Sequence, residues 1–329
     1  MTGRKTNMVN ELNAEQKKVL AFSQSVINEV RKVVIGKDDI IVKVLLSILA
    51  GGHILIEDIP GVGKTTLAIA LSKALSLDYK RMQFTPDVLP SDVTGFSVLD
   101  KDTHEFRYKE GAAMTNLFLA DEINRTSSKT QSALLEVMEE GRVTVDGVAH
   151  KVPDPYIVIA TQNPMGSIGT QNLPESQLDR FLVRLTMGYP SFDSEINMLK
   201  SKNTNVSTDA VNGVVTKTDI IQAKKTVDDI YVSDEVLGYI ASLSNATRNN
   251  NYIKLGLSPR GSIALLKICK ATALLKGRDY VIPDDVLYCF EDVVMHRLVF
   301  ESKAKLNGLT HAQILQSVIS GVQVPRINR

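Results

Sequence analysis

The chain has 329 residues, of which 43% are hydrophobic and 23% are charged, and its formal net charge is +1. This length accommodates two domains with full hydrophobic cores, and the composition excludes an intrinsically disordered protein. The near-zero charge excludes the strongly basic surface typical of tight, nonspecific nucleic-acid binding and leaves room only for a local basic patch.

The N-terminal segment through Asn13 is polar and lacks the apolar stretch of a signal peptide. The longest strongly apolar run, residues 44–50, is too short to cross a bilayer, so we expect a cytoplasmic protein without stable membrane insertion. Cys269 and Cys289 lie inside helical patterns without C-x-x-C spacing, which indicates buried free thiols. The histidines show no metal-ligand spacing, and none is assigned a role.

Residues 10–34 and a segment that starts at Asp38 have helical hydrophobic patterns, and Gly51-Gly52 ends the second one. Five short apolar runs follow, with helical segments between several of them. This alternation predicts an α/β fold in which a five-stranded parallel sheet carries helices on both faces. The expected strands are residues 53–57, 79–84, 117–121, 156–161 and 181–187.

Two inserts interrupt this alternation, and both have the pattern of a β-hairpin. Residues 96–108 show two short strand-like runs around a polar turn. Residues 142–152 contain Asp146-Gly147, a strong signal for a tight hairpin turn.

The pattern changes after Tyr189-Pro190, which closes the α/β part. Residues 201–218 are rich in Asn, Thr and Ser and indicate a loop, and the segments after it are helical. We therefore predict an α/β core with N-terminal helices and both hairpins over residues 1–190, followed by a small all-helical domain over residues 191–329.

Residues 54–66 have the order of strand, glycine turn and helix that characterises a phosphate-binding loop. Backbone N–H groups around Gly61 and Gly63 can surround a phosphate, and the helix N-terminus adds partial positive charge. Lys64 can reach the β- and γ-phosphates, and the Thr65 hydroxyl can ligate Mg²⁺. Asp58 stands where the loop consensus has its first glycine, so its carboxylate must turn away from the phosphates. The ligands expected here are the phosphates of a nucleotide and Mg²⁺, and the residues expected to bind the nucleotide are Pro60, Gly61, Val62, Gly63, Lys64, Thr65 and Thr66.

The run Leu117–Ala120 indicates a buried parallel strand that ends in Asp121 and Glu122. Ligands bind at the carboxyl ends of the strands in open α/β sheets. Asp121 can hold the metal, together with Thr65, and Glu122 can polarise a water for attack on the γ-phosphate.

Three further polar features lie where a nucleotide hydrolase would use them. Asn163 ends a strand that, if it lies between the other two, places an amide near the attacking water. Arg180 and Arg184 lie at the entrance to the last strand, and either one could act as an arginine finger on a neighbouring subunit. Arg260 lies in the first turn of a helix, where its charge is poorly placed unless an anion such as phosphate approaches. The expected catalytic set is Glu122, Asn163, Arg180 and Arg260.

Taken in order, these motifs resemble the AAA+ ATPases and most closely the MoxR family. The resemblance runs from about Val34 to the tail at residues 322–326, and its blocks are residues 58–68, 118–125, 133–141, 160–164, 173–181 and 258–260. It implies that Lys64 and Thr65 form Walker A, Asp121 and Glu122 Walker B, Asn163 sensor 1, Arg260 sensor 2 and Arg180 the finger in trans. It also implies that Val34, Ile35 and Gly36 line the adenine pocket.

The resemblance further implies a hexameric ring that acts as a chaperone, often with a partner that carries a von Willebrand factor A domain, for instance in metal-cofactor insertion. The hairpins look like the helix-2 insert and the pre-sensor-1 insert of that clade. We therefore expect a Mg-dependent ATPase that remodels or matures a client protein and does not bind nucleic acid.

Three other functions are compatible with a nucleotide-binding α/β core, and each makes a different demand on the sequence. A DNA motor would need basic hairpin tips, but residues 99–102 and 145–147 carry more acid than base. An ATPase subunit of a magnesium-chelatase-like enzyme has a similar architecture, but the short chain and the MoxR-type blocks favour the chaperone. A nucleotide switch without turnover is disfavoured because every catalytic position is filled.

Overall fold

The computed structural model describes residues 12–163, 171, 173–203 and 207–326. The chain forms two compact units: one spans Gln24–Gln222, and the other joins the residues up to Ser23 with Ala223–Arg329. The domain division expected at residue 190 stays a prediction.

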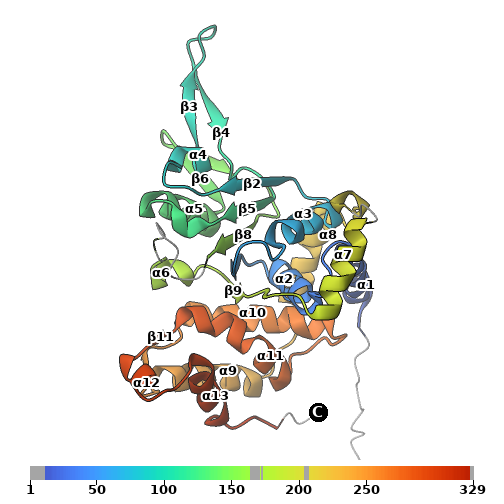
Figure 1. The fold of residues 1–329 in the computed structure, drawn as a ribbon, viewed down its shortest axis with the longest axis vertical. Coiled ribbons are helices and arrows are strands. Elements are labelled where there is room, and N and C mark those ends of the chain that lie inside the picture. Colours follow the sequence, from blue (N-terminus) through green and yellow to red (C-terminus); the bar gives the residue numbers. More distant parts are fainter. Residues whose placement is uncertain (1–11, 164–170, 172, 204–206, 327–329) are drawn as a thin grey trace, which may run out of the picture. The chain divides into compact units, whose positions relative to one another are not determined.

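The first unit is built on a five-stranded sheet in which neighbouring strands run parallel, in the order β2-β5-β8-β1-β9 (Figure 1). Its strands are apolar where both faces of the sheet are covered, and all five residues of β5 are buried. Because β8 lies between β5 and β1, the carboxyl ends of these three strands meet at one edge. The strands are β1 (Ile54–Glu57), β2 (Tyr79–Gln83), β5 (Leu117–Asp121), β8 (Ile157–Gln162) and β9 (Val183–Leu185). The predicted α/β fold is confirmed.

Helices bury both faces of this sheet. On one face, Phe118 shares a hydrophobic core with Leu134 and Met138 of α5 (Ser128–Glu140), while Leu117 and Leu119 are fully buried on the other. Ser127 caps α5 by accepting a hydrogen bond from the backbone N–H of Thr130. The other helices that lie in this unit or enter it are α1 (Ala14–Arg31), α2 (Asp38–Leu49), α3 (Lys64–Ala74), α4 (Pro90–Thr94), η1 (Ile123–Arg125), α6 (Glu175–Leu178), α7 (Phe192–Asn203), η2 (Thr208–Ala210) and α8 (Lys217–Asp228).

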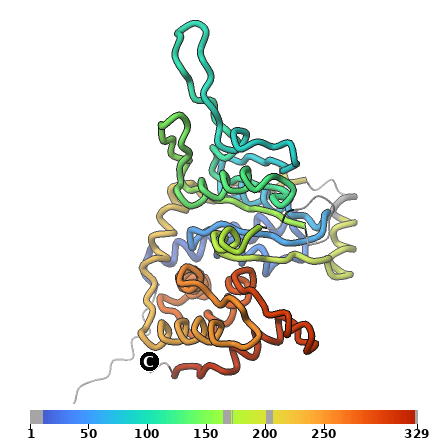
Figure 2. The backbone as a smooth tube through the Cα atoms, turned by 90° about the vertical axis from the view of Figure 1, so that its left-hand side faces the viewer, coloured from blue at the N-terminus to red at the C-terminus, as the bar shows by residue number. Residues whose placement is uncertain are grey.

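Both expected hairpins are present. The first pairs β3 (Gly95–Leu99) with β4 (Phe106–Glu110) and projects from the sheet (Figures 1 and 2). The second pairs β6 (Arg142–Val145) with β7 (Val148–Lys151), and both residues of its Asp-Gly turn have positive φ, as a type I′ turn requires. The stacked rings of Tyr108 and His150, 3.9 Å apart, join the two hairpins.

The second unit is helical apart from a ribbon of β10 (Ile253–Leu255) and β11 (Val299–Phe300). Ser258 caps α10, and Pro259 occupies its first position, where its missing N–H costs no hydrogen bond. Its helices are α9 (Asp234–Arg248), α10 (Pro259–Leu275), α11 (Pro283–Val294), η3 (Met295–Arg297), α12 (Ser302–Leu306) and α13 (His311–Ser320).

Inside this unit the fully buried Asp285 carboxylate accepts hydrogen bonds from both terminal nitrogens of Arg278, at 2.6 and 2.7 Å. Cys269 and Cys289 are free and buried, as predicted. Over the described ranges of the whole chain, no helix has the length and hydropathy needed to cross a membrane.

Candidate functional site

The phosphate-loop segment connects β1 to α3 through two glycines in the left-handed region, Gly61 with φ +86° and Gly63 with φ +99°. Side chains other than glycine rarely adopt this backbone conformation. A Cβ built on Gly61 would meet no heavy atom within 4 Å, so open space lies against the loop backbone. Gly63 caps α3 without a side-chain hydrogen bond, so the N–H groups of this helix start are available to an anion.

Lys64 opens α3 and is only 8% exposed. Its Nζ donates to the carbonyl oxygen of Asp58 at 2.7 Å. Burial lowers the pKa of the Lys64 ammonium, while the carboxylates of Asp58, Asp121 and Glu122 oppose that shift. The lysine is therefore close enough to interact with Asp121, the last residue of β5, and with Glu122, which follows it.

The Asp58 carboxylate accepts hydrogen bonds from the backbone N–H of Ile59 at 2.8 Å and of Gly188 at 2.6 Å. Both oxygens are thus occupied by backbone donors, and one bond ties the loop to the chain that follows β9. This contact explains how an acidic residue replaces the consensus glycine, and it agrees with the expectation that the carboxylate turns away from the phosphates.

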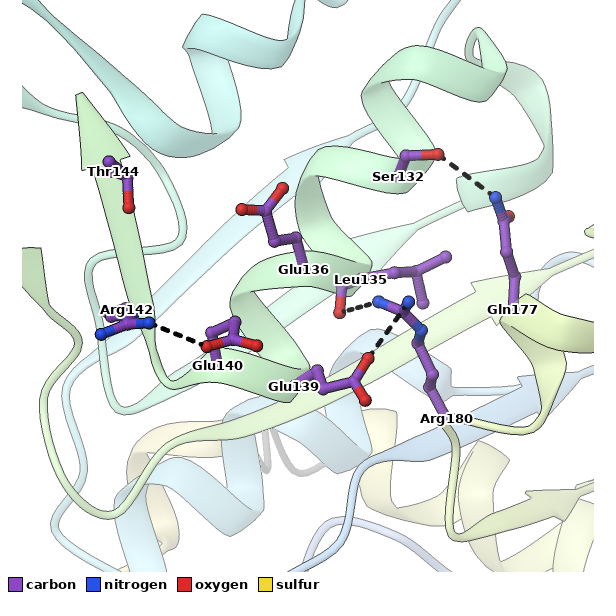
Figure 3. A pocket seen from close by; sticks show the side chains of 9 residues that line it. All are labelled: Ser132, Leu135, Glu136, Glu139, Glu140, Arg142, Thr144, Gln177 and Arg180. Carbon is purple, nitrogen blue, oxygen red and sulfur yellow. Dashed lines mark hydrogen bonds and ion pairs between the residues drawn. The ribbon is translucent and has the colours of Figure 1, made fainter. Parts of the chain in front are cut away.

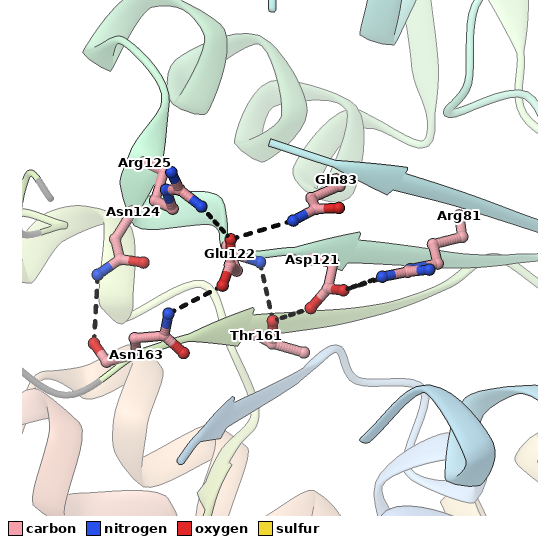
Figure 4. Close-up of polar contacts among 8 residues, drawn as sticks. All are labelled: Arg81, Gln83, Asp121, Glu122, Asn124, Arg125, Thr161 and Asn163. Atoms are coloured by element: carbon pink, nitrogen blue, oxygen red, sulfur yellow. Dashed lines mark hydrogen bonds and ion pairs between the residues drawn. The ribbon is translucent and has the colours of Figure 1, made fainter. Parts of the chain in front are cut away.

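Asp121 lies at the end of β5 with its carboxylate held from two sides (Figure 4). The hydroxyl of Thr161 donates to Oδ1 at 2.6 Å, and Nη2 of Arg81 donates to Oδ2 at 2.7 Å. The same Thr161 oxygen accepts a hydrogen bond from the backbone N–H of Glu122 at 2.8 Å. Thr161 therefore links the Asp121 carboxylate to the backbone N–H of Glu122.

The Glu122 carboxylate is bound by three donors: Nη1 of Arg125 at 2.7 Å, Nδ2 of Asn163 at 2.9 Å and Nε2 of Gln83 at 3.4 Å (Figure 4). Partial burial alone would raise the pKa of Glu122. The hydrogen bonds from Arg125, Asn163 and Gln83 outweigh burial, so the pKa of Glu122 lies below its ordinary value. Glu122 also has a φ of +57°, which is unusual for a residue with a side chain.

The strand of Asn163, β8, lies between β5 and β1, the condition on which the expectation for its amide rested, and Asn163 contacts Glu122. Sequence reasoning missed Arg81, Gln83, Thr161 and Arg125 as parts of this network. Arg81 and Gln83 come from the edge strand β2, and their partners are set by the pairing of Gln83 with Asp121 across the sheet. Of these four residues, only Thr161 ends an apolar run, so no local pattern marked the other three.

A cavity of about 370 Å³ joins the phosphate loop to the segment before α2. It brings Val34 and Ile35 together with Val62 and Thr66. Gly36 lies beside Val34 and Ile35 in a left-handed conformation, and a Cβ there would collide with Ser194. The remaining lining residues are Val33, Lys37, Gly61, Gly63, Pro190, Met198, Ser207 and Thr208. The mainly apolar wall and the adjoining phosphate loop fit a nucleotide with its base in this cavity.

The two candidate finger arginines lie apart. Nη1 of Arg184 donates to the Glu57 carboxylate on the neighbouring strand of the same subunit, at 2.8 Å. Arg180 follows α6 and reaches α5, where it lines a second cavity of about 480 Å³ (Figure 3). Arg260 belongs to the other compact unit and is exposed in the first turn of α10.

Residues 53–183 match the ATPase family associated with various cellular activities (AAA), and residues 245–318 match the AAA lid domain. The chain is 48% identical to the uncharacterized protein YeaC of Bacillus subtilis over 91% of its own length and 93% of that protein. It is 33% identical to the chaperone MoxR1 of Mycobacterium tuberculosis over 91% of its length and 81% of the relative. A crystal structure from Cytophaga hutchinsonii, provisionally described as an ATPase, superposes with a TM-score of 0.88 at 35% identity and covers 95% of this chain and 97% of that one.

These similarities extend over both compact units and include the phosphate loop, the Asp-Glu strand end and the lid. They agree with the motifs that carry the resemblance and with the parallel sheet that brings those motifs to one edge. The chain belongs to the MoxR family of AAA+ ATPases.

Proposed function

We propose that this ATPase hydrolyses ATP to ADP and phosphate at the strand edge around Lys64 and Glu122, and that hydrolysis drives an oligomeric, MoxR-type chaperone. The observation that carries the proposal is the Asn163–Glu122 hydrogen bond, 2.9 Å long, at the end of the strand next to the phosphate loop. It supports a role for Glu122 in activating water and for Asn163 in orienting it.

The loop from Pro60 to Thr66 binds the phosphates through its backbone N–H groups and the Lys64 ammonium. The base occupies the cavity beside Val34, Ile35 and Gly36. Thr65 and Asp121 supply hydroxyl and carboxylate oxygens, the donors that Mg²⁺ prefers when phosphates complete its coordination. When bound, Mg²⁺ would neutralise and orient the phosphate oxygens.

Glu122 acts as the general base. Its lowered pKa keeps the carboxylate ionised at neutral pH, so it can accept a hydrogen bond from the attacking water. Oε1 accepts one bond, from Asn163, and Oε2 accepts bonds from Arg125 and Gln83. Because an ionised carboxylate has about four acceptor sites, Oε1 can still accept a bond from water.

Arg180 acts on the nucleotide of a neighbouring subunit in a ring, which we take to be a hexamer as in the family. Arg184 is the alternative finger. Each of the two arginines pairs with a carboxylate of its own subunit, so the choice of Arg180 rests on its place in the family motif. Arg260 responds to the nucleotide from the lid.

The projecting β3–β4 hairpin supports the binding of a client protein, because two apolar residues at its tip are exposed: Phe106 is 74% exposed and Leu99 is 48% exposed. The name of the Mycobacterium tuberculosis relative, chaperone MoxR1, supports work on a protein partner. A von Willebrand factor A-domain protein is the proposed co-partner, and maturation of a metalloenzyme is the proposed task.

The test compares two variants of the purified protein in nucleotide binding and phosphate release. Lys64→Ala should lose nucleotide binding, because the phosphates lose their buried cation. Glu122→Gln should keep binding and lose turnover by about 100-fold or more, the usual contribution of a general base. Full turnover by Glu122→Gln would refute the assignment of the base.

A further inference from the structure

The guanidinium of Arg180 is docked on helix α5 of its own subunit (Figure 3). Nη1 donates to the carbonyl oxygen of Leu135 at 2.7 Å, and Nη2 lies 3.1 Å from Oε2 of Glu139. Nε is buried without a hydrogen-bond partner. The arginine therefore occupies a defined position with one of its donors unsatisfied.

The surroundings of Arg180 favour a cation. Glu136, Glu139 and Glu140 lie in the last two turns of α5 and line the same cavity. The helix ends at residue 140, and its C-terminal half carries the negative end of the helix dipole. Of the three carboxylates, Glu140 has a different partner in Arg142, at 3.1 Å. Glu139 is the carboxylate that pairs with Arg180.

The contact is partly open to solvent, with 30% of the Arg180 side chain and 35% of the Glu139 side chain exposed. Partly exposed ion pairs of this kind exchange readily and contribute little net stability. A phosphate binds the planar guanidinium through two parallel hydrogen bonds, so it offers this arginine a better partner than the present one.

We propose that Glu139 is the resting partner of Arg180, and that Arg180 leaves it for the γ-phosphate of ATP held by the neighbouring subunit. The proposal rests on the proposed function, in which Arg180 acts in trans. Glu139 is then a positioning residue: breaking its ion pair opposes ATP-dependent assembly, and its charge sets the protein concentration at which the ring forms.

The test measures ATP-dependent assembly by sedimentation velocity, in the Glu122→Gln background so that ATP persists. Adding Glu139→Gln, which keeps the side-chain size and removes the charge, should lower the protein concentration at half-assembly about two- to fivefold, as expected for loss of a partly exposed ion pair. Without ATP it should change nothing. Glu136→Gln is the matched control, because it removes the same charge one turn earlier in the same cavity, and it should leave the midpoint in place.

A double-mutant cycle isolates the pair. In an Arg180→Ala background, Glu139→Gln should no longer move the midpoint. Glu139→Asp keeps the charge but shortens the side chain, so it should shift the midpoint of assembly less than Glu139→Gln. It replaces Glu139→Gln in the test if that variant folds poorly. The proposal is overturned if Glu139→Gln behaves like Glu136→Gln, if the shift persists without Arg180, or if ATP causes no assembly.

Failure of this proposal is distinguishable from failure of the proposed function. If Arg180→Ala abolishes ATP hydrolysis while Glu139→Gln leaves assembly unchanged, Arg180 remains the arginine finger and the assignment of Glu139 as its resting partner is wrong. If Arg180→Ala hydrolyses ATP as fast as the parent protein, the finger assignment itself falls.

Discussion

Replacing Asp58 by glycine restores the consensus of the phosphate loop, yet we predict that it destabilises this protein. Asp58 is 5% exposed, and its carboxylate binds the backbone N–H groups of Ile59 and Gly188. The bond to Gly188 joins two segments that are 130 residues apart in the chain. Asp58→Gly removes both acceptors and leaves these donors without their partner.

The magnitude follows from these two bonds. A hydrogen bond to a charged group contributes about 1.5–3 kcal/mol. The bond to the adjacent Ile59 is local and forms partly in the unfolded chain, so the Gly188 bond dominates. Glycine adds about 0.5–1 kcal/mol of backbone entropy cost. The free energy of unfolding should fall by about 2–4 kcal/mol, which lowers Tm by about 3–6 °C in a chain of this length.

Thermal unfolding followed by circular dichroism, together with ATP binding, provides the assay. Asp58→Asn is the matched control: its single side-chain oxygen can accept only one of the two bonds, so it should lose about half as much stability. A Tm for Asp58→Gly within about 2 °C of the parent would refute the reasoning and show that the consensus glycine is as good as this carboxylate.

Three further predictions concern the network, the lid and the ring. Arg125→Gln removes a hydrogen bond that lowers the pKa of Glu122, so the pKa of Glu122 should rise. The acid limb of the kcat–pH profile should then move to higher pH. An acid limb that stays in place would contradict the role of Arg125 in lowering this pKa. Asp285→Ala removes the carboxylate that pairs with the largely buried Arg278 and should lower the free energy of unfolding, measured in urea, by about 3–5 kcal/mol. A loss below about 1 kcal/mol would contradict this prediction. Mixing Arg180→Ala with Lys64→Ala subunits should restore part of the ATPase activity, whereas no recovery argues against a finger in trans.

The parts of the fold that short-range patterns encode were predictable. Residues 117–120 form an uninterrupted apolar run, and they lie in a strand buried on both faces. Asp146-Gly147 specifies a tight turn because both positions need positive φ, and the hairpin is present. Ser258-Pro259 marks a helix start because the cap and the fixed φ of proline act within one turn.

The parts that depend on long-range pairing were not predictable. Thr161 joins Asp121 and Glu122 only because β8 lies beside β5, which no local pattern specifies. Arg81 reaches Asp121 from an edge strand whose register was unknown. The ribbon of β10 and β11 was missed because strands of three and two residues are too short to show alternation.

The central claim is that ATP bound at this site drives work on a protein partner. The most direct test is affinity capture from native cell extract with Glu122→Gln protein, in the presence of ATP or ADP, with Lys64→Ala as the control that lacks nucleotide. The account predicts a protein partner that is retained with ATP and absent with ADP and from the control. Recovery of DNA together with replication or recombination proteins, or capture that is the same under all conditions, would contradict it.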